Sequence, residues 1–138
     1  TGEEFVMAIG DIDYFKRVND QYGHDCGDAV LKGIAKLMQR QLREVDSVCR
    51  WGGEEFMVLF SGTDLQGGEV AANKIRLAVA QYSQSCAKSN IQVSITLGYC
   101  MYDGAADIRE CLKLADEALY AGKAAGRNRV VMAARPDQ

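Results

Sequence analysis

The sequence predicts an α+β fold in which a central, mainly antiparallel sheet is flanked by helices. Segments with strand-like and helix-like apolar periodicity follow one another in the order β-α-α-β-β-α-β-α-β. Two apolar segments, 47–51 and 54–60, are separated by Gly52-Gly53, and a glycine pair between strands is typical of a tight hairpin. Strands interleaved with helices around one central hairpin indicate a ferredoxin-like core.

The first half of the chain supplies a strand and two helical segments before this hairpin. A short buried strand covers 5–9 and ends at Gly10-Asp11. A helical turn begins near Asp13, a residue type that caps helices, and Gly23 interrupts it. A long helix covers 25–41, because apolar residues recur there every three to four positions.

The second half alternates helix and strand. Gly67-Gly68 precede a second helix, and residues 91–99 alternate apolar and polar side chains, which predicts a half-buried strand. Apolar residues between Ile108 and Leu119 are spaced as in a third helix, and 130–133 form a final short strand.

The composition is that of an ordinary globular domain. The 138 residues suffice for one domain with its own core. Hydrophobic residues make up 48% and charged residues 25%, which excludes a disordered tail and a collagen-like fibre. The net charge of −3 disfavours binding to nucleic acid, since such domains carry a basic excess. No apolar run is long enough to span a bilayer, so we expect no membrane contact.

Five cysteines are present: Cys26, Cys49, Cys86, Cys100 and Cys111. Their number is odd and no two form a Cys-x-x-Cys pair, which is typical of neither a disulfide framework nor a zinc site. We therefore expect each to be an unpaired, small buried residue. This cysteine usage predicts a cytoplasmic domain, either by itself or as the cytoplasmic part of a membrane-anchored receptor.

Acidic residues gather around the predicted hairpin. Asp11 lies where the first strand ends, and Glu54 and Glu55 follow Gly52-Gly53. If the hairpin pairs beside the first strand, these carboxylates converge at one edge of the sheet, and hard oxygen ligands suit Mg²⁺. Because successive strand residues point to opposite faces, only one of the two glutamates can face Asp11 directly. The alternative is a pair of solvated surface glutamates.

Basic residues form a second group. Lys123, Arg127 and Arg129 surround Gly126 after the third helix, and Lys16 lies in the first helical turn. Lysine with the amides of a helix start makes a natural phosphate site. The alternative is that the basic residues complement a helix C-terminus. Acids for Mg²⁺ and bases for phosphate in one small domain are typical of nucleotide chemistry.

Four blocks of residues, in order and with matching spacing, give the sequence a specific resemblance. They run from about residue 5 to residue 131 and comprise 11–16 with Asn19-Asp20, then 23–28, then Arg50-Trp51-Gly52-Gly53-Glu54-Glu55-Phe56, then Tyr120, Lys123 and Gly126-Arg127-Asn128. In these blocks the chain resembles the GGDEF-domain diguanylate cyclases, with a Gly-Gly-Glu-Glu-Phe signature. The resemblance implies a fold related to nucleotidyl cyclases and polymerase palms.

The resemblance also implies a reaction, in which two GTP condense into cyclic di-GMP and two pyrophosphates. In such enzymes each protomer of a transient homodimer holds one GTP, and the ribose 3′-hydroxyl of one attacks the α-phosphate of the other. By resemblance, Mg²⁺ or alternatively Mn²⁺ is held by Asp11, the backbone carbonyl of Ile12 and Glu54. Glu54 is then the candidate base, and Glu55 is a second metal ligand or the alternative base.

The remaining substrate contacts are implied in the same way. Asn19 and Asp28 are expected to bind guanine, since a carboxylate accepts two hydrogen bonds that adenine cannot donate. His24 falls in the loop of this pocket, with a hydrogen bond at the helix start as the alternative. The residues expected at the triphosphate are Phe15, Lys16, Lys123 and Arg127.

A second motif, Arg43-Glu44-Val45-Asp46, precedes the hairpin. In the family, an Arg-x-x-Asp at this offset is the site of product inhibition by cyclic di-GMP. Family members usually add an arginine from the next helix, and that position falls on Lys74 here, with Arg76 nearby. The structural alternative is a surface ion pair worth less than about 1 kcal/mol.

The chain departs from the family pattern before the first strand, where an Asp-x-Leu-Thr-Gly-Leu-x-Asn-Arg segment is usual and none is present. We expect residues 1–138 to be a single catalytic domain without that segment or an upstream sensor domain, which dimerises weakly. Two other functions stay open. One is an inactive module that senses cyclic di-GMP or GTP, and the other is a cyclase or polymerase for another nucleotide.

Overall fold

A computed structural model describes residues 4–104 and 107–133. In chain order the elements are β1 (Phe5–Ile12), α1 (Phe15–Tyr22), α2 (His24–Gln41), β2 (Ser47–Gly52), β3 (Glu55–Ser61), α3 (Leu65–Gln81), β4 (Gln84–Cys86), β5 (Ser89–Ile91), β6 (Ile95–Tyr102), α4 (Ile108–Ala124) and β7 (Val130–Met132). The main sheet has the order β2-β3-β1-β6-β7, and its pairs are antiparallel except β6 with β7. The predicted α+β class is confirmed.

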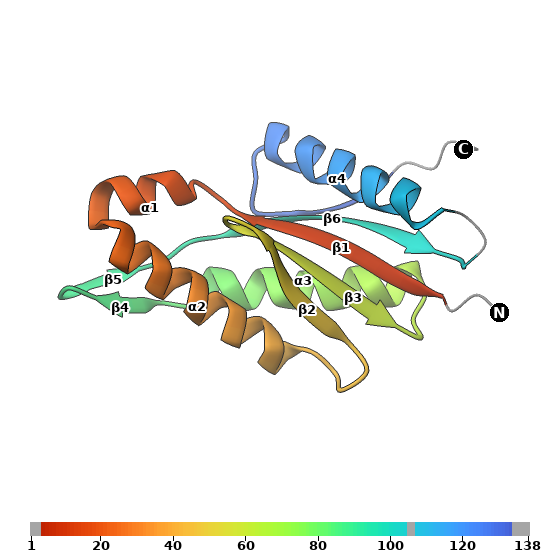
Figure 1. Cartoon of the computed structure of the whole chain (residues 1–138), viewed down its shortest axis with the longest axis horizontal. Helices are drawn as coiled ribbons and strands as arrows, with labels where there is room; N and C mark the ends of the chain where they lie inside the picture. Colours follow the sequence, from red (N-terminus) through yellow and green to blue (C-terminus); the bar gives the residue numbers. More distant parts are fainter. Residues whose placement is uncertain (1–3, 105–106, 134–138) are drawn as a thin grey trace.

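Helices cover both faces of this sheet (Figure 1). The larger core lies between the sheet and α2 and α3, and the smaller one lies between the sheet and α4. Alternate residues of β1 serve the two cores: Val6, Ala8 and Ile12 face the larger, while Met7 and Ile9 face the smaller. The central strand β1 therefore carries Asp11 to the face that α4 covers.

The predicted strand at 91–99 is wrong in its bounds and burial. Residue 91 ends β5, and a separate strand, β6, begins at Ile95. The first six residues of β6 are all buried, including the polar Thr96, because helices lie on both faces. Thr96 tolerates burial because its hydroxyl donates to Asp13 over 2.6 Å.

The small sheet formed by β4 and β5 was not predicted, so the observed order has two more strands than expected. Its turn, Ala87-Lys88, has φ values of 50° and 67°. Glycine and asparagine are the usual residues in this left-handed conformation, and other residues rarely adopt it. Because Ala87-Lys88 contains neither, the sequence carries no signal of a tight turn here.

Helix α4 lies unusually close to β6 at Gly98. A Cβ atom there would lie 2.3 Å from both the Ala115 carbonyl oxygen and the Leu119 amide nitrogen, which are backbone atoms. Only glycine permits this approach. The contact holds the C-terminal end of α4, and with it Lys123, beside the end of β1.

Two helix starts differ from expectation. Asp13 caps no helix, since the N-cap of α1 is Tyr14, with φ 55°. Helix α3 begins before Gly67-Gly68, because Asp64 caps it by accepting from the Gly67 amide over 2.8 Å. Among the described residues, no helix is long and apolar enough to cross a membrane.

The expectation that every cysteine is unpaired is wrong. Cys26 in α2 and Cys86 in β4 form a disulfide across 60 positions of sequence. Fold proximity, which no spacing motif reveals, brings them together. Cys100 and Cys111 are buried as expected, whereas Cys49 is exposed on β2.

Candidate functional site

The acidic residues of the hairpin meet the end of the first strand. Glu55, the first residue of β3, pairs with Asp11 of β1, and residues that pair in this way point to the same face of a sheet. The Ile12 amide donates to the Glu54 carbonyl over 3.2 Å, which holds the turn against the strand end. Glu55 therefore faces Asp11 directly, whereas Glu54, the preceding residue, points to the other side of the turn.

Asp11 is a buried acid with one cationic partner. The Lys123 ammonium, from the last turn of α4, lies 2.9 Å from Oδ2 of Asp11, whose side chain is 12% exposed. The other oxygen, Oδ1, is buried and has no hydrogen-bond partner among the described residues. A buried carboxylate oxygen without a partner costs free energy, so this atom is a binding position for a cation or a proton donor.

Negative charge exceeds positive charge around this point. Burial raises the pKa of Asp11, and the charges of Glu54 and Asp13 add to the rise against the opposing effect of Lys123. Burial also raises the pKa of Glu55, and the neighbouring charges of Asp11, Asp116 and Glu54 raise it further. Among the charged groups that shift these two pKa values, carboxylates outnumber the one cation, Lys123.

The donors present suit a divalent cation that arrives with a ligand. Across residues 4–104 and 107–133, no three His, Cys, Asp or Glu side chains form a ready-made metal cage. The available donors are carboxylate oxygens, with Oδ1 of Asp11 unpartnered. Mg²⁺ commonly takes one or two carboxylates and fills its other positions with water and phosphate oxygens. Asp11 together with one of the two hairpin glutamates fits that pattern.

A cavity of about 360 Å³ adjoins the acids, between α1, α2 and the β2–β3 turn. Its lining residues are Phe15, Lys16, Asn19, Asp28, Leu31, Arg50, Gly53 and Glu54. Five of these were candidates from the sequence, so residues from three separate motifs do meet in one cavity. Glu55 instead lines a groove on the α4 side, together with Asp116 and the cations Arg109 and Lys113. The two glutamates thus serve opposite sides of the turn.

Close packing of α1 on α2 shapes this cavity. A Cβ atom at Gly27 would lie 1.9 Å from Oδ1 of Asn19 and 3.2 Å from the Phe15 ring. Gly27 lies inside α2, so it acts as a close-packing position between the two helices. Its missing side chain lets Asn19 stand between the two helices.

Arg50 is a lining residue that the sequence reasoning left without a role. Its Nε donates to the Gly53 carbonyl over 2.7 Å and so braces the hairpin turn beside Glu54. Its position immediately before the Trp-Gly-Gly sequence is the signal that could have identified it.

Three of the expected guanine and triphosphate contacts lie outside the cavity lining. His24 is the exposed first residue of α2 and does not line it. Lys123 is held on Asp11, and Arg127 places its guanidinium 4.5 Å from the centre of the Tyr14 ring. Nε of Arg127 is buried with no hydrogen-bond partner in the described part of the chain, which leaves a donor for an anion near the start of α1.

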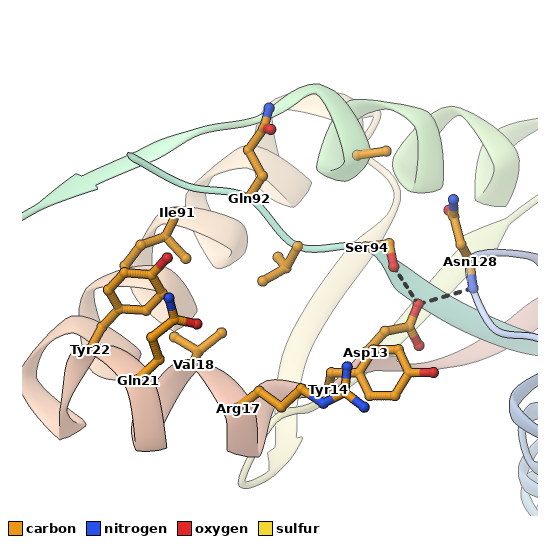
Figure 2. Close-up of a pocket in the computed structure, with 12 residues that line it drawn as sticks. Asp13, Tyr14, Arg17, Val18, Gln21, Tyr22, Ile91, Gln92, Ser94 and Asn128 are labelled. Carbon is orange, nitrogen blue, oxygen red and sulfur yellow. Dashed lines mark hydrogen bonds between the residues drawn. The ribbon is translucent and has the colours of Figure 1, made fainter. Parts of the chain in front are cut away.

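Asp13 holds the Arg127 loop in place and is a hydrogen-bond centre, not a helix cap. Its carboxylate accepts from the Ser94 hydroxyl over 2.6 Å and from the Asn128 amide over 3.0 Å, in addition to Thr96. Figure 2 shows the bonds from Ser94 and Asn128 at one end of a groove of about 440 Å³ along α1. Because the oxygens of Asp13 are already paired, this acid positions the loop after α4.

The Arg-x-x-Asp motif forms its own site, remote from the acids. Asp46, with a side chain only 3% exposed, accepts from Nε and Nη2 of Arg43 over 3.1 and 2.9 Å. Burial disfavours the charged form of Asp46, but hydrogen bonds from Arg43 and the Ser61 amide outweigh it and lower its pKa. Arg43, Asp46 and Lys74 all line one cavity of about 260 Å³ between the α2–β2 loop and α3.

Comparison with known proteins identifies the family of this chain. Residues 1–129 match the family described as "Diguanylate cyclase, GGDEF domain". The chain belongs to the GGDEF family. It is 37% identical over 132 residues to the diguanylate cyclase DgcP of Pseudomonas aeruginosa, covering 96% of this chain and 20% of DgcP. It is 40% identical over 133 residues to the response regulator PleD of Caulobacter vibrioides, covering 94% of this chain and 29% of PleD.

Solved GGDEF structures share the fold. The active GGEEF domain of a Vibrio cholerae diguanylate cyclase superposes with a TM-score of 0.87 at 33% identity, covering 96% of this chain and 85% of that one. The GGDEF domain of DgcB from Caulobacter crescentus, in complex with c-di-GMP, gives 0.88 at 28% identity, covering 94% and 78%. This GGDEF domain spans between a fifth and about a third of the length of its curated relatives.

Replacing Glu55 by glutamine should stabilise this GGDEF domain in metal-free buffer at neutral pH. Folding raises the pKa of Glu55, so ionising this carboxyl destabilises the folded state. The free energy of unfolding therefore falls as pH rises through that pKa. Glu55 is only half-buried, so screening limits the gain to about 0.5 kcal/mol, or roughly 2 °C. Thermal unfolding measures it.

The advantage of Glu55→Gln should vanish at acidic pH, where the parent carboxyl is protonated. Glu44→Gln, at an exposed loop position, is the matched control and should leave the unfolding temperature unchanged. A Glu55→Gln domain less stable than the parent at neutral pH would contradict an excess of negative charge at this site.

Proposed function

We propose that this GGDEF domain condenses two GTP into cyclic di-GMP with release of two pyrophosphates, using Mg²⁺ or alternatively Mn²⁺. The observation that carries the proposal is the position of the β2–β3 turn at the end of β1: Glu55 pairs with Asp11 there, and Glu54 lines the cavity that Asn19 and Asp28 also line. Relatives that are 37–38% identical over nearly the whole chain are named diguanylate cyclases, which supports the same reaction here.

Guanine is the base that the cavity accommodates by its hydrogen-bonding chemistry. The Asp28 carboxylate accepts from N1–H and the exocyclic amine of guanine, and Asn19 adds an amide donor and acceptor. Adenine lacks that donor pair, so its binding leaves Asp28 unpaired and costs about 1–3 kcal/mol. The side chains of Asn19 and Asp28 thus select GTP over ATP.

The triphosphate lies, in this proposal, between Lys16, Lys123 and Arg127. Lys16 lies in the first turn of α1, where free backbone amides also bind phosphate oxygens, and Phe15 contributes its amide. Arg127 offers its unpartnered Nε. The phosphates compete with Asp11 for the Lys123 ammonium, so nucleotide binding exchanges one ionic partner of Lys123 for another.

Asp11, the Ile12 carbonyl and the hairpin glutamates are the residues that would hold the divalent cation. When bound, such a cation neutralises phosphate charge and makes the attacking hydroxyl more acidic. Glu54 lines the cavity and is the candidate that takes the proton from the ribose 3′-hydroxyl; Glu55 assists as a ligand or replaces it as base. His24 contributes at most an outer contact to the nucleotide, because it lies outside the cavity lining.

Each domain binds one GTP, so the reaction requires two protomers that face each other in a transient homodimer. The 3′-hydroxyl from one protomer attacks the α-phosphate on the other, and two such displacements close the ring. The rate should therefore rise more steeply than linearly with protein concentration, as expected when a weak dimer is the active form.

Incubation with GTP and Mg²⁺, followed by chromatography, should yield cyclic di-GMP. Asp28→Ala should lower kcat/KM for GTP by about tenfold to a hundredfold and bring GTP closer to ATP as a substrate. Asp25→Ala, three positions earlier and outside the cavity lining, is the matched control and should retain the parent rate. If no product forms at high protein concentration while cyclic di-GMP still binds, the domain is a sensing module instead.

The cavity of Arg43, Asp46 and Lys74 is proposed to bind cyclic di-GMP and inhibit the enzyme. Nε and Nη2 of Arg43 donate to Asp46 and to the Ser61 carbonyl, which fixes the guanidinium and leaves the two N–H groups of Nη1 to donate to O6 and N7 of guanine. The DgcB structures contain c-di-GMP, which supports a product site in this fold. Lys74 supplies a point charge and not a planar fork, so binding here is weaker than with arginine at that position.

Calorimetry should show cyclic di-GMP binding that Arg43→Ala weakens by about tenfold or more, because two charge-assisted hydrogen bonds are lost. Lys74→Arg should tighten binding. Arg40→Ala, an exposed cation near the end of α2 that does not line the cavity, is the control and should bind as the parent does. Equal affinity of the parent and Arg43→Ala would remove the assignment of Arg43.

A further inference from the structure

The disulfide between Cys26 and Cys86 joins the nucleotide side of the domain to the separate β4–β5 sheet. Cys26 lies in the first turn of α2, two residues before Asp28, and is 3% exposed. Cys86 ends β4 and is half-buried, with the two Cα atoms 5.8 Å apart. In Figure 1 the β4–β5 hairpin lies next to the start of α2, away from the main sheet.

Apart from this bond, side-chain packing and not backbone pairing ties the hairpin to the rest of the domain. The hairpin consists of two strands of three residues that pair only with each other. A two-stranded hairpin is marginal in water, and the left-handed Ala87 and Lys88 add backbone strain to its turn. Ile91 buries its side chain near Tyr22 at the end of α1, as Figure 2 shows.

The two sulfur atoms are brought together by packing as well as by the bond. Gly33 lies seven residues after Cys26, on the same face of α2. A Cβ atom at Gly33 would lie 2.5 Å from the Gln84 side-chain oxygen and 2.3 Å from the Tyr82 hydroxyl, so β4 docks against this face. Reduced thiols would therefore stay close enough to pair again.

The start of α2 is also where the proposed guanine cavity is built. Gly27 and Asp28 follow Cys26 directly, and Gly27 packs against Asn19 and Phe15 of α1. A restraint on Cys26 is thus a restraint on the turn of α2 that carries Asp28 and that packs, through Gly27, against Asn19 of α1. Loosening the hairpin lets this turn move.

We propose that Cys26 and Cys86 form a reversible redox site whose oxidation tightens GTP binding and whose reduction weakens it. The proposal rests on the proposed function for its ligand. Its physical basis is covalent restraint. With the bond intact, the strained hairpin and the first turn of α2 move as one unit, so Asn19 and Asp28 are already ordered before GTP binds. GTP binding then loses less free energy to the ordering of these side chains.

The chemistry is thiol–disulfide exchange with a low-molecular-weight thiol and its disulfide, such as glutathione. In reduction, the thiolate attacks the more accessible sulfur, that of Cys86, and the S–S bond breaks with Cys26 leaving as a thiolate that takes a proton. A second thiol then releases Cys86 and forms the oxidised small molecule. Oxidation is the reverse, in which the two protein thiols give two electrons to the small disulfide and two thiols are released.

The test compares the parent domain oxidised with glutathione disulfide and reduced with dithiothreitol. Peptide mapping should find the 26–86 crosslink in the first and both Cys26 and Cys86 alkylated in the second. Reduction should raise KM for GTP by about fivefold, at the lower end of usual coupling between sites, and change kcat much less. If the bond were purely structural, its reduction would lower the unfolding temperature and leave KM unchanged.

Two variants separate this site from general thiol effects. Cys86→Ser should behave as the reduced parent in both buffers, with a raised KM that oxidant does not change. Cys49→Ser removes the exposed thiol of β2 and should respond to redox state as the parent does. Equal KM in the oxidised and reduced parent, or absence of the crosslink in glutathione disulfide, would overturn the proposal.

A failure of the proposed function is distinguishable. If neither redox form makes cyclic di-GMP, the cyclase assignment fails, and binding of a non-hydrolysable GTP analogue decides the redox proposal by itself. About fivefold weaker binding of the analogue by the reduced parent supports it, and equal binding by both forms overturns it.

Discussion

The structure depends on the burial of one carboxylate at the end of the central strand. Asp11 is placed between strands β3 and β6 and under helix α4, with Lys123 on one oxygen and no partner among the described residues on the other. Glu55 faces it from the neighbouring strand. A fold under selection for stability alone gains nothing from this arrangement, because burial and like charge both raise the pKa values of the two acids. A bound cation would offset this unfavourable free energy, because it neutralises both carboxylates while it binds phosphate.

Several structural devices keep this arrangement in register. Gly98 allows α4 to lie directly on β6, which positions Lys123. Asp13 ties the loop after α4 to β6 through Ser94, Thr96 and Asn128, and so orients Arg127. Arg50 braces the hairpin turn that presents Glu54. Elements from both ends of the chain therefore meet at the end of β1, while the Arg43–Asp46 pair forms a separate cavity at the far end of β3, where Ser61 contacts it.

Much of this could be predicted from the sequence, and the reasons for the rest are physical. Gly52-Gly53 located the hairpin, and the motif residues Asn19, Asp28 and Glu54 do line one cavity. The β4–β5 hairpin was missed because Ala87-Lys88 adopt a conformation that their residue types disfavour. The disulfide was missed because its cysteines lie 60 positions apart and meet only through the packing of that hairpin on α2. Asp13 has a residue type that suits both a cap and a buried hydrogen-bond centre, and only the three-dimensional structure distinguishes them.

The central claim is that unbalanced carboxylates at the end of β1 bind a divalent cation together with a nucleotide. The most direct measurement is electron paramagnetic resonance of Mn²⁺ titrated with the domain and a non-hydrolysable GTP analogue. The account predicts that the analogue promotes Mn²⁺ binding, that binding weakens as pH falls through the raised pKa values of Asp11 and Glu55, and that Asp11→Asn weakens it at least about tenfold. Mn²⁺ binding of equal strength in the parent and Asp11→Asn would contradict it.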